Sequence, residues 1–227
     1  MGDFCDSSDY GSFGDIKNIR EDLMKNTTCD GEIRDVLIKD LESNKNNIKI
    51  IQELGLGYYN SRIDIAVINQ EFCGYEIKSD RDTLKRLDMQ IYSYNNIFDR
   101  ITIVLGRNKI SEAKKIIPDF WGTIIAFKKD GKLLLKKCRR AELNKNINLQ
   151  GLVNLLWRIE IAQILRGEKL YKGLSGYSKY GLVEVVLEKI SEDKIRSHFK
   201  KILTDRLWEW RTEYQKYKEK CRGKYIE

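Results

Sequence analysis

The chain has few of the residues that build metal and redox sites. It contains one histidine and one proline in 227 residues. A single histidine excludes any metal site that needs two histidine ligands. The five cysteines are scattered along the chain, and no two of them have the C-x-x-C spacing of a zinc or redox site: Cys5, Cys29, Cys73, Cys138 and Cys221. This usage argues against a disulfide framework and predicts a cytoplasmic protein.

Long apolar runs are also absent. No run reaches the roughly eighteen apolar residues that a membrane-spanning helix needs, so we expect no membrane partner. The acidic N-terminal segment is unlike a signal peptide. The glycine-containing segment 55–59 lacks the GxxxxGK[ST] pattern of a nucleotide-binding loop. Hydrophobic residues make up 41% of the chain, which is enough for one sizeable domain with a small appendage.

Positive charge is in excess and is unevenly distributed. The net charge is +8, of which residues 149–227 contribute +6 and residues 1–148 contribute +2. Cationic surfaces attract phosphate backbones without sequence preference. We therefore expect a nucleic acid as the partner and the C-terminal part as the main electrostatic surface. The charge does not distinguish single-stranded from double-stranded DNA, or DNA from RNA.

Two short apolar segments, Arg62–Ile68 and Phe72–Lys78, are rich in branched residues and predict a β-hairpin. Side chains alternate between the two faces of a strand, so Glu76 and Lys78 point the same way. Asp64 lies in the preceding strand. If the strands pair, two carboxylates and an ammonium group meet on one patch of sheet.

Carboxylates among apolar strands lose hydration, at a cost on the order of several kcal/mol per ion unless a partner compensates. Mg²⁺ is one such partner, because it takes oxygen ligands from one or two carboxylates and keeps several waters. Mn²⁺ is expected to substitute for it. Lys78 would then hold a metal-bound water or offset the charge of a phosphate. The alternative is an ordinary salt bridge on a solvated sheet face.

The segment after Lys78 predicts a helix that packs back on the sheet. Ser79 and Asp80 are good N-cap residues, and residues 81–98 have helical periodicity. Gln90 and Tyr94 are four positions apart, so they lie on neighbouring positions of one helix side. Tyr94 also belongs to the apolar stripe of this helix, and a packed core tyrosine is its alternative role.

Asp64, Glu76-Ile77-Lys78 and Gln90-x-x-x-Tyr94 together resemble the PD-(D/E)XK nuclease superfamily. The likeness is to the branch of RecB-type and Holliday-junction-resolving nucleases, and within it to a small bacterial and phage family. It covers roughly residues 30–130. Ile63 departs from the pattern, since the family has proline before the first aspartate.

The resemblance implies an α/β fold with a restriction-endonuclease-like αβββαβ core, in which helices flank a central mixed sheet. It also implies Mg²⁺-dependent hydrolysis of DNA phosphodiester bonds. Asp64 and Glu76 would bind the metal, with the Ile77 carbonyl as a further ligand. Lys78 would assist the attacking water, Gln90 would orient the lysine or a phosphate, and Tyr94 would support it.

A fourth acidic ligand has two candidates. Glu32 lies in a predicted first helix, at a distance before Asp64 that matches the resolvase-like branch. Its alternative role is that of an ordinary first-turn glutamate favoured by the helix dipole. Glu53, which ends a predicted strand just before the glycine-containing segment, is the competing candidate.

Composition predicts four parts. Residues 1–27 form a flexible arm, 28–138 the nuclease-like core, 139–150 a polar linker, and 151–227 a basic helical domain that is faintly similar to SAP-like DNA-binding modules. A helical cap packed on the core is the alternative for the last part. Asp130-Gly131 predicts a hairpin turn within the core.

Side chains outside the motif extend the predicted DNA contacts. Candidate phosphate contacts are Arg62, Arg81, Lys85 and Lys179. The aromatic side chains of Trp208, Trp210, Tyr214 and Tyr217 would stack on bases, or else would pack on their own domain or in a homodimer. Two other functions remain open: a catalytically silent nuclease-fold protein that binds DNA or protein, and an interaction protein of a phage or defence system.

Overall fold

The computed structural model describes residues 27–44 and 47–206. Predictions for the arm before residue 27, and for Trp208, Trp210, Tyr214 and Tyr217, lie outside these ranges. Six strands form one sheet: β1 (Lys49–Gly55), β2 (Arg62–Ile68), β3 (Phe72–Lys78), β4 (Arg100–Gly106), β5 (Gly122–Lys129) and β6 (Lys132–Arg139). They lie side by side in sequence order. The β3–β4 and β4–β5 pairs are parallel and the others are antiparallel, so the sheet is mixed.

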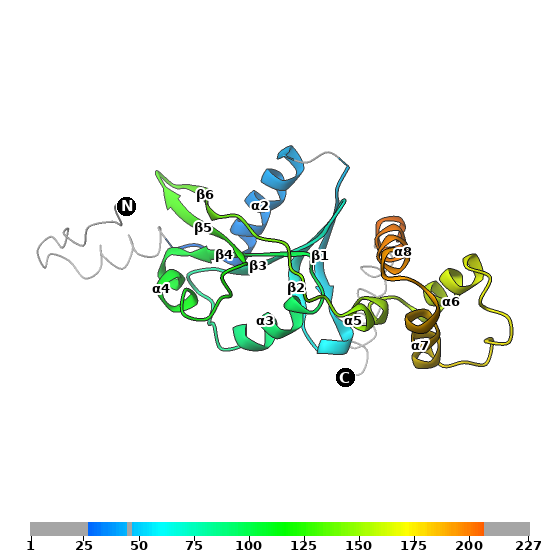
Figure 1. The fold of residues 1–227 in the computed structure, drawn as a ribbon. Coiled ribbons are helices and arrows are strands. Elements are labelled where there is room, and N and C mark those ends of the chain that lie inside the picture. Colours follow the sequence, from blue (N-terminus) through cyan, green and yellow to red (C-terminus); the bar gives the residue numbers. More distant parts are fainter. Residues whose placement is uncertain (1–26, 45–46, 207–227) are drawn as a thin grey trace, which may run out of the picture.

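Helices cover both faces of this sheet. They are α2 (Asp30–Asn44), α3 (Leu87–Asn95), α4 (Ile110–Ala113), α5 (Leu149–Asn154), α6 (Arg158–Gly167), α7 (Lys179–Lys189) and α8 (Glu192–Asp205), with short 3-10 helices η1 (Gly57–Tyr59) and η2 (Arg107–Lys109). Figure 1 shows α2 on one side of the sheet, α3 and α4 on the other, and α6–α8 gathered at one end. The α/β class and the helical C-terminal part are thereby confirmed. No helix within the described ranges is both long and apolar enough to cross a membrane.

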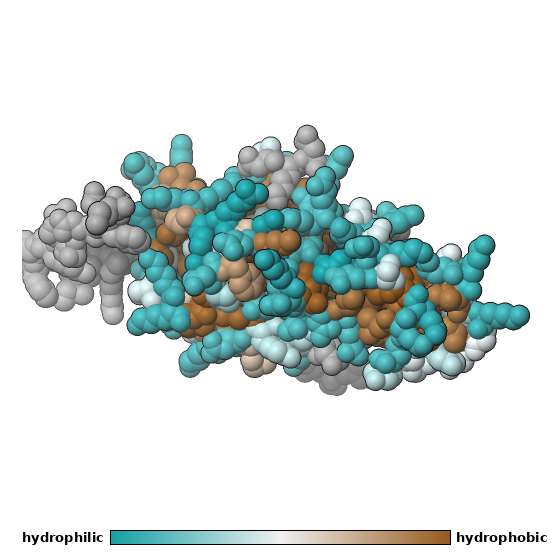
Figure 2. Space-filling model, viewed as in Figure 1, coloured by the Kyte–Doolittle hydropathy of each residue, from teal (hydrophilic) through white to brown (hydrophobic). Residues whose placement is uncertain are grey.

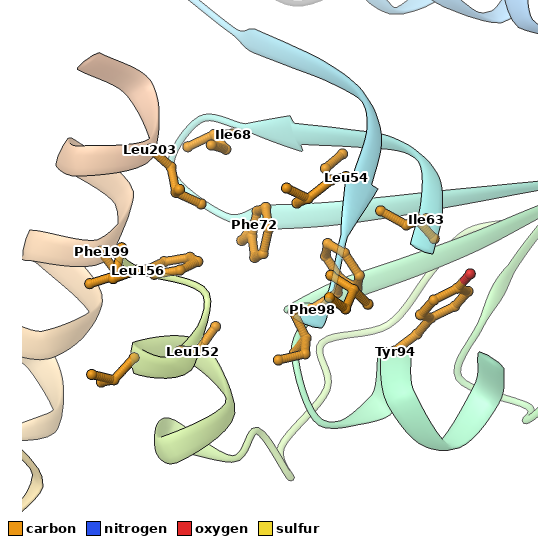
Figure 3. Packing of buried hydrophobic residues seen from close by; sticks show 14 of the residues in the cluster. Leu54, Ile63, Ile68, Phe72, Tyr94, Phe98, Leu152, Leu156, Phe199 and Leu203 are labelled. Carbon is orange, nitrogen blue, oxygen red and sulfur yellow. The ribbon is translucent and has the colours of Figure 1, made fainter. Parts of the chain in front are cut away.

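Two hydrophobic clusters hold the layers together. On one face, α2 packs Ile33, Leu37 and Leu41 against residues such as Ile65 and Val104. On the other face, α3 and the C-terminal helices share a single cluster with the sheet, as Figure 3 shows. The helices after residue 149 therefore bury their apolar sides in the same core as the strands. The division into separate domains stays a prediction.

Phe72 joins the sheet to the C-terminal helices. Its ring centroid lies 4.6 Å from that of Phe98 and 5.2 Å from that of Phe199 in α8. Gly74 makes room for Phe98, since a Cβ at this position would come within 2.9 Å of the Phe98 ring. The predicted linker is also tied down, because the buried Asn144 donates hydrogen bonds to the carbonyls of Asn95 and Phe98 at 2.7 and 3.0 Å.

The predicted strands 62–68 and 72–78 and the Asp130-Gly131 hairpin turn are confirmed. The helix predicted over 81–98 is wrong at its start, because it begins only at Leu87. Asp82 accepts hydrogen bonds from the Ser79 N–H and hydroxyl at 2.7 and 2.6 Å. Asp80, the other predicted cap, instead accepts from the Thr28 N–H at 2.9 Å. These carboxylates close a turn and tie down the start of α2.

The predicted helical part begins with two helices, α5 and α6, where one continuous helix could have formed. The two are separated between Asn154 and Arg158, and the Glu160 carboxylate accepts the Trp157 N–H at 2.6 Å at the start of α6. The buried Arg206 donates from Nε to Glu160 at 2.7 Å, and its guanidinium lies 4.2 Å from the Trp157 ring centroid. This ion pair fixes the end of α8 against the start of α6.

Candidate functional site

The site forms where β2 and β3 separate. The two strands pair from Ile65–Tyr75 to Ile68–Phe72, and Asp64 lies beyond the last pair. The Asp64 Oδ2 atom accepts the Ile77 N–H at 2.7 Å, so a side chain takes the place of the backbone acceptor in the ladder. The apolar residues around Asp64 and Ile77 thus form two strands. Polar groups line a pocket where these strands separate.

Glu76 is the centre of the site. Its Oε1 accepts hydrogen bonds from Lys78 Nζ and Gln90 Nε2, both at 2.6 Å, and its Oε2 accepts one from the Tyr94 hydroxyl at 2.6 Å. Glu76 is only 2% exposed and Lys78 only 6%. The structure therefore brings Glu76, Lys78, Gln90 and Tyr94 together, and the spacing of four residues places both α3 side chains on the same carboxylate.

Burial sets the acid–base behaviour of these groups. Burial raises the pKa of Glu76 to about 7, and the nearby Asp64 charge adds to the rise while Lys78 opposes it. Burial also raises the pKa of Asp64, against the Ile77 N–H and the Arg34 guanidinium. The pKa of the Tyr94 hydroxyl is raised by burial and by Glu76. Near neutral pH, Glu76 is consequently balanced between its charged and neutral forms.

Sequence reasoning missed Arg34, the main partner of Asp64. Its Nη2 lies 3.0 Å from Asp64 Oδ1, 2.9 Å from Asp30 and 2.7 Å from Glu53. Its Nη1 donates to the Asp64 carbonyl at 2.9 Å. The only local signal was the spacing of four residues between Asp30 and Arg34 in one helix. Asp64 is thus held from the α2 side, whereas Glu76 is held from the α3 side.

The two candidates for a fourth acid lie in different places. Glu32 pairs with Lys128 at 2.9 Å, and the structure does not bring it to the other site residues. Glu53 reaches the site through Arg34 and also pairs with Arg62 Nε at 2.6 Å. Its backbone has a φ of 54°, which is unusual for a residue other than glycine. Of the two, Glu53 belongs to the cluster.

An open pocket of about 680 Å³ lies over the site. Its wall includes both carboxylates, Lys78 and Gln90, together with Arg62 and Arg86. The buried Gln90 Oε1 atom has no hydrogen-bond partner among the described residues. The remaining lining residues are Asp30, Gly55, Gly57, Asn60, Ser61, Ile77, Asp82 and Met89.

A metal does not fit the site as it stands. All four carboxylate oxygens of Asp64 and Glu76 already accept hydrogen bonds from protein groups. Over residues 27–44 and 47–206, no group of three or more His, Cys, Asp or Glu side chains could hold a metal ion. Ile77 contributes its N–H rather than its carbonyl. Mg²⁺ binding and the catalytic roles of these residues stay predictions.

The predicted phosphate contacts are in differing surroundings. Arg81 and Lys85 are exposed on the segment before α3. Arg62 is exposed but pairs with Glu53. The Lys179 ammonium donates to the Asn154 carbonyl at 2.7 Å, and burial lowers its pKa. Lys179 therefore ties α7 to α5, while the other three side chains face solvent.

Comparison with known proteins gives a family for the whole arrangement. The family model described as Bacteriophage P4 protein cII matches residues 20–225. "Protein cII" of Enterobacteria phage P4 is 27% identical over 147 residues, which are 65% of this chain and 55% of that protein. The chain thus spans about half the length of the curated relative that it matches. No solved structure matches the chain.

These matches overturn the nuclease assignment. The matched range contains every motif residue from Glu32 to Tyr94, and the family is not one of PD-(D/E)XK nucleases. The predicted family is therefore wrong, and so is the function of a Mg²⁺-dependent DNA hydrolase that depended on it. The physical reason is that the same acidic and basic residues can neutralise one another, as Glu76 and Lys78 do. Since the family model matches most of its length, the chain belongs to the phage P4 cII family.

Proposed function

We propose that this cII-family protein acts by binding DNA without cutting it. The observation that carries the proposal is the saturation of the central cluster. Both carboxylates are occupied by protein donors, from Arg34 on one side and from Lys78, Gln90 and Tyr94 on the other. Such a cluster pins α2, the strands and α3 together, which is a structural role.

DNA is the proposed partner because the chain carries an excess of positive charge. The charges of Glu76 and Lys78 cancel within the cluster, so the net charge of +8 comes from other residues. A surplus of this size favours association with polyanions. Action in the cytoplasm, expected from the dispersed cysteines, is part of the same proposal.

We also propose that the order α2-β1-β2-β3-α3-β4 is a restriction-endonuclease-like kernel used as a scaffold. The support is the element order, together with the position of Glu76 and Lys78 on the central strand β3. An experimental structure whose strands superpose poorly on that kernel would refute this part alone.

A second candidate function is binding of another protein through the C-terminal helices. Ile159, Tyr177 and Tyr180 are exposed there. Figure 2 shows hydrophobic residues gathered on the viewed face over these helices. A homodimer is one form that this binding would take.

The test combines binding and integrity of DNA. The full chain is titrated into a fluorescein-labelled 30-bp duplex at several NaCl concentrations, and is also incubated with supercoiled plasmid in MgCl₂, MnCl₂ or EDTA. We expect anisotropy to rise with an affinity that falls as salt increases, and plasmid that stays supercoiled in all three buffers. Absence of binding at low salt would refute the proposal. Cleavage that depends on Mg²⁺ and is lost in Asp64→Asn would refute it as well.

A further inference from the structure

The β5–β6 hairpin is the most densely charged part of the sheet. Residues 122–139 carry six basic side chains and one acidic side chain, whereas α2 carries two basic and five acidic ones. The hairpin lies at the edge of the sheet, on the side away from α6 and α7 (Figure 1). Sequence reasoning placed the electrostatic surface in the C-terminal helices and overlooked this hairpin.

The lysines of the hairpin fall on two faces. Leu133 and Leu135 of β6 pack toward α2, and Lys128 and Lys137 occupy the same face. The opposite face carries Lys129, Lys132 and Lys136, because Lys129 pairs with Lys132 and Ile125 pairs with Lys136 in the strand register. Leu134 lies between them and is 41% exposed.

Only one of these faces is neutralised. On the α2 side, Lys128 pairs with Glu32 and Lys137 pairs with Asp40, each at 2.9 Å. On the other side, Lys129, Lys132 and Lys136 are exposed, and none of them forms an ion pair with a residue in the described ranges. The acidic helix thus compensates one face of the hairpin and leaves the other positive.

Arg107 of η2 extends the positive face beyond the hairpin. Its guanidinium lies 4.6 Å from the ring centroid of Phe127, the cross-strand partner of Leu134. Arg107 is exposed and has no ion-pair partner in the part of the chain that the structure describes. Four cations therefore surround a small apolar centre. We call this set the hairpin face: Arg107, Lys129, Lys132 and Lys136 around Leu134.

We propose that the hairpin face is the surface that receives a DNA duplex. This inference rests on the proposed function and specifies its contact surface. A two-stranded ribbon has the dimensions to enter the major groove, which is roughly 12 Å wide. Lys136 follows Lys132 by four positions, which corresponds to about 13 Å along β6. The lysines at the two ends would reach phosphates on either side of the groove, and Leu134 would face the base edges between them.

Protection of the sheet edge is the other explanation for lysines on β6. Charged residues on an edge strand prevent pairing with another chain. That explanation covers Lys132 and Lys136, and it extends to Lys129 because β5 pairs with β4 only as far as Ala126. It does not cover Arg107, which lies outside the sheet. A DNA-contacting face accounts for all four positions.

The experiment compares two triple variants of the full chain by anisotropy on the labelled 30-bp duplex. One is Lys129→Ala/Lys132→Ala/Lys136→Ala. The matched control is Lys145→Ala/Lys172→Ala/Lys201→Ala, which removes the same charge from exposed positions elsewhere. We expect the hairpin variant to bind at least about tenfold more weakly, and its log–log salt slope to fall by about 2.7, at about 0.9 per lost phosphate contact. The control should change affinity less than about threefold.

The outcomes separate this inference from the proposed function. If the wild-type chain does not bind the duplex, the proposed function fails and the inference fails with it. If the wild type binds but both triple variants lose affinity equally, or only the control does, DNA binding stands and the hairpin face is wrong. A second pair of variants does not depend on lysine loss: a photo-crosslinking phenylalanine at Leu134 should capture the duplex, and one at Leu143, which is slightly more exposed, should not.

Discussion

The cluster around Glu76 and the hairpin face use the same kinds of charged residue in opposite ways. In the cluster, the buried Lys78 lies 2.6 Å from the Glu76 carboxylate, which neutralises its charge inside the fold. On the hairpin face, Lys132 is exposed and has no acidic partner in the described ranges. Burial and pairing, rather than residue type, thus decide whether a charge stabilises the protein or recruits a partner.

The free energy of unfolding gives the most direct test of this comparison. Replacing Lys78 with methionine leaves Glu76 buried without its cation, and removing one partner of a buried pair costs about 3–5 kcal/mol. Replacing Lys132 in the same way should change the free energy of unfolding by less than about 0.5 kcal/mol, since the site is exposed. Urea unfolding measures both. The double variant Glu76→Gln/Lys78→Met should recover most of the loss, and equal effects of the two single lysine changes would contradict the distinction.

The pH dependence of stability gives the next largest effect. The folded chain holds the Glu76 proton up to about pH 7, whereas the unfolded chain releases it near 4.5. Protonation therefore stabilises the fold at low pH, and this contribution is lost as pH rises through 7. The free energy of unfolding should fall by up to about 3 kcal/mol between pH 5 and 8. The slope should be clearly smaller in Glu76→Gln, and a wild-type profile with the same slope as that of the variant would count against the coupling.

Binding should rank the two regions in the reverse order. Lys132→Glu places a negative charge on the hairpin face, and we expect duplex affinity to fall about tenfold or more. Glu76→Gln alters only the buried cluster, so affinity should stay within about threefold of the wild type at pH 8. Anisotropy on one duplex at fixed salt measures both variants. A larger effect of Glu76→Gln would place the DNA at the pocket instead.

The smallest expected effect concerns the neutralised face of the hairpin. Glu32→Gln or Asp40→Asn would free Lys128 or Lys137, and each should strengthen duplex binding about two- to threefold at low salt. Stability should change by less than about 0.5 kcal/mol, because these are partly exposed pairs. Glu184→Gln makes the same charge change at an exposed position of α7 and serves as the control. Equal gains in all three variants would mean that only net charge matters.

Local patterns in the sequence predicted most of the sheet and part of the cluster. Alternating apolar residues gave the strands that carry Asp64 and Glu76, and the spacing of Gln90 and Tyr94 gave two of the partners of Glu76. These relations depend on periodicities within one element or between adjacent ones. They therefore do not depend on how distant elements pack.

Contacts between elements that are far apart in the sequence could not be predicted from local patterns. Arg34 reaches Asp64 only because α2 packs across the sheet, and no local pattern reports that contact. The same helix supplies Glu32 and Asp40 to the hairpin, so the division into a neutral and a positive face also depends on packing. The family assignment failed for a related reason. A few charged residues at a given spacing look alike whether they bind a metal or one another.

Asp80 holds the backbone next to Arg107 in place. Besides the start of α2, its carboxylate accepts the Asn108 N–H at 2.9 Å, and Gly106 leaves it space, since a Cβ there would lie 2.6 Å from Asp80 Oδ1. The backbone after Arg107 is thereby held by the Asp80 side chain, which packs closely against Gly106 on the other side. An arginine mounted in this way gives up little backbone freedom when a phosphate arrives, so more of the attraction is retained as affinity.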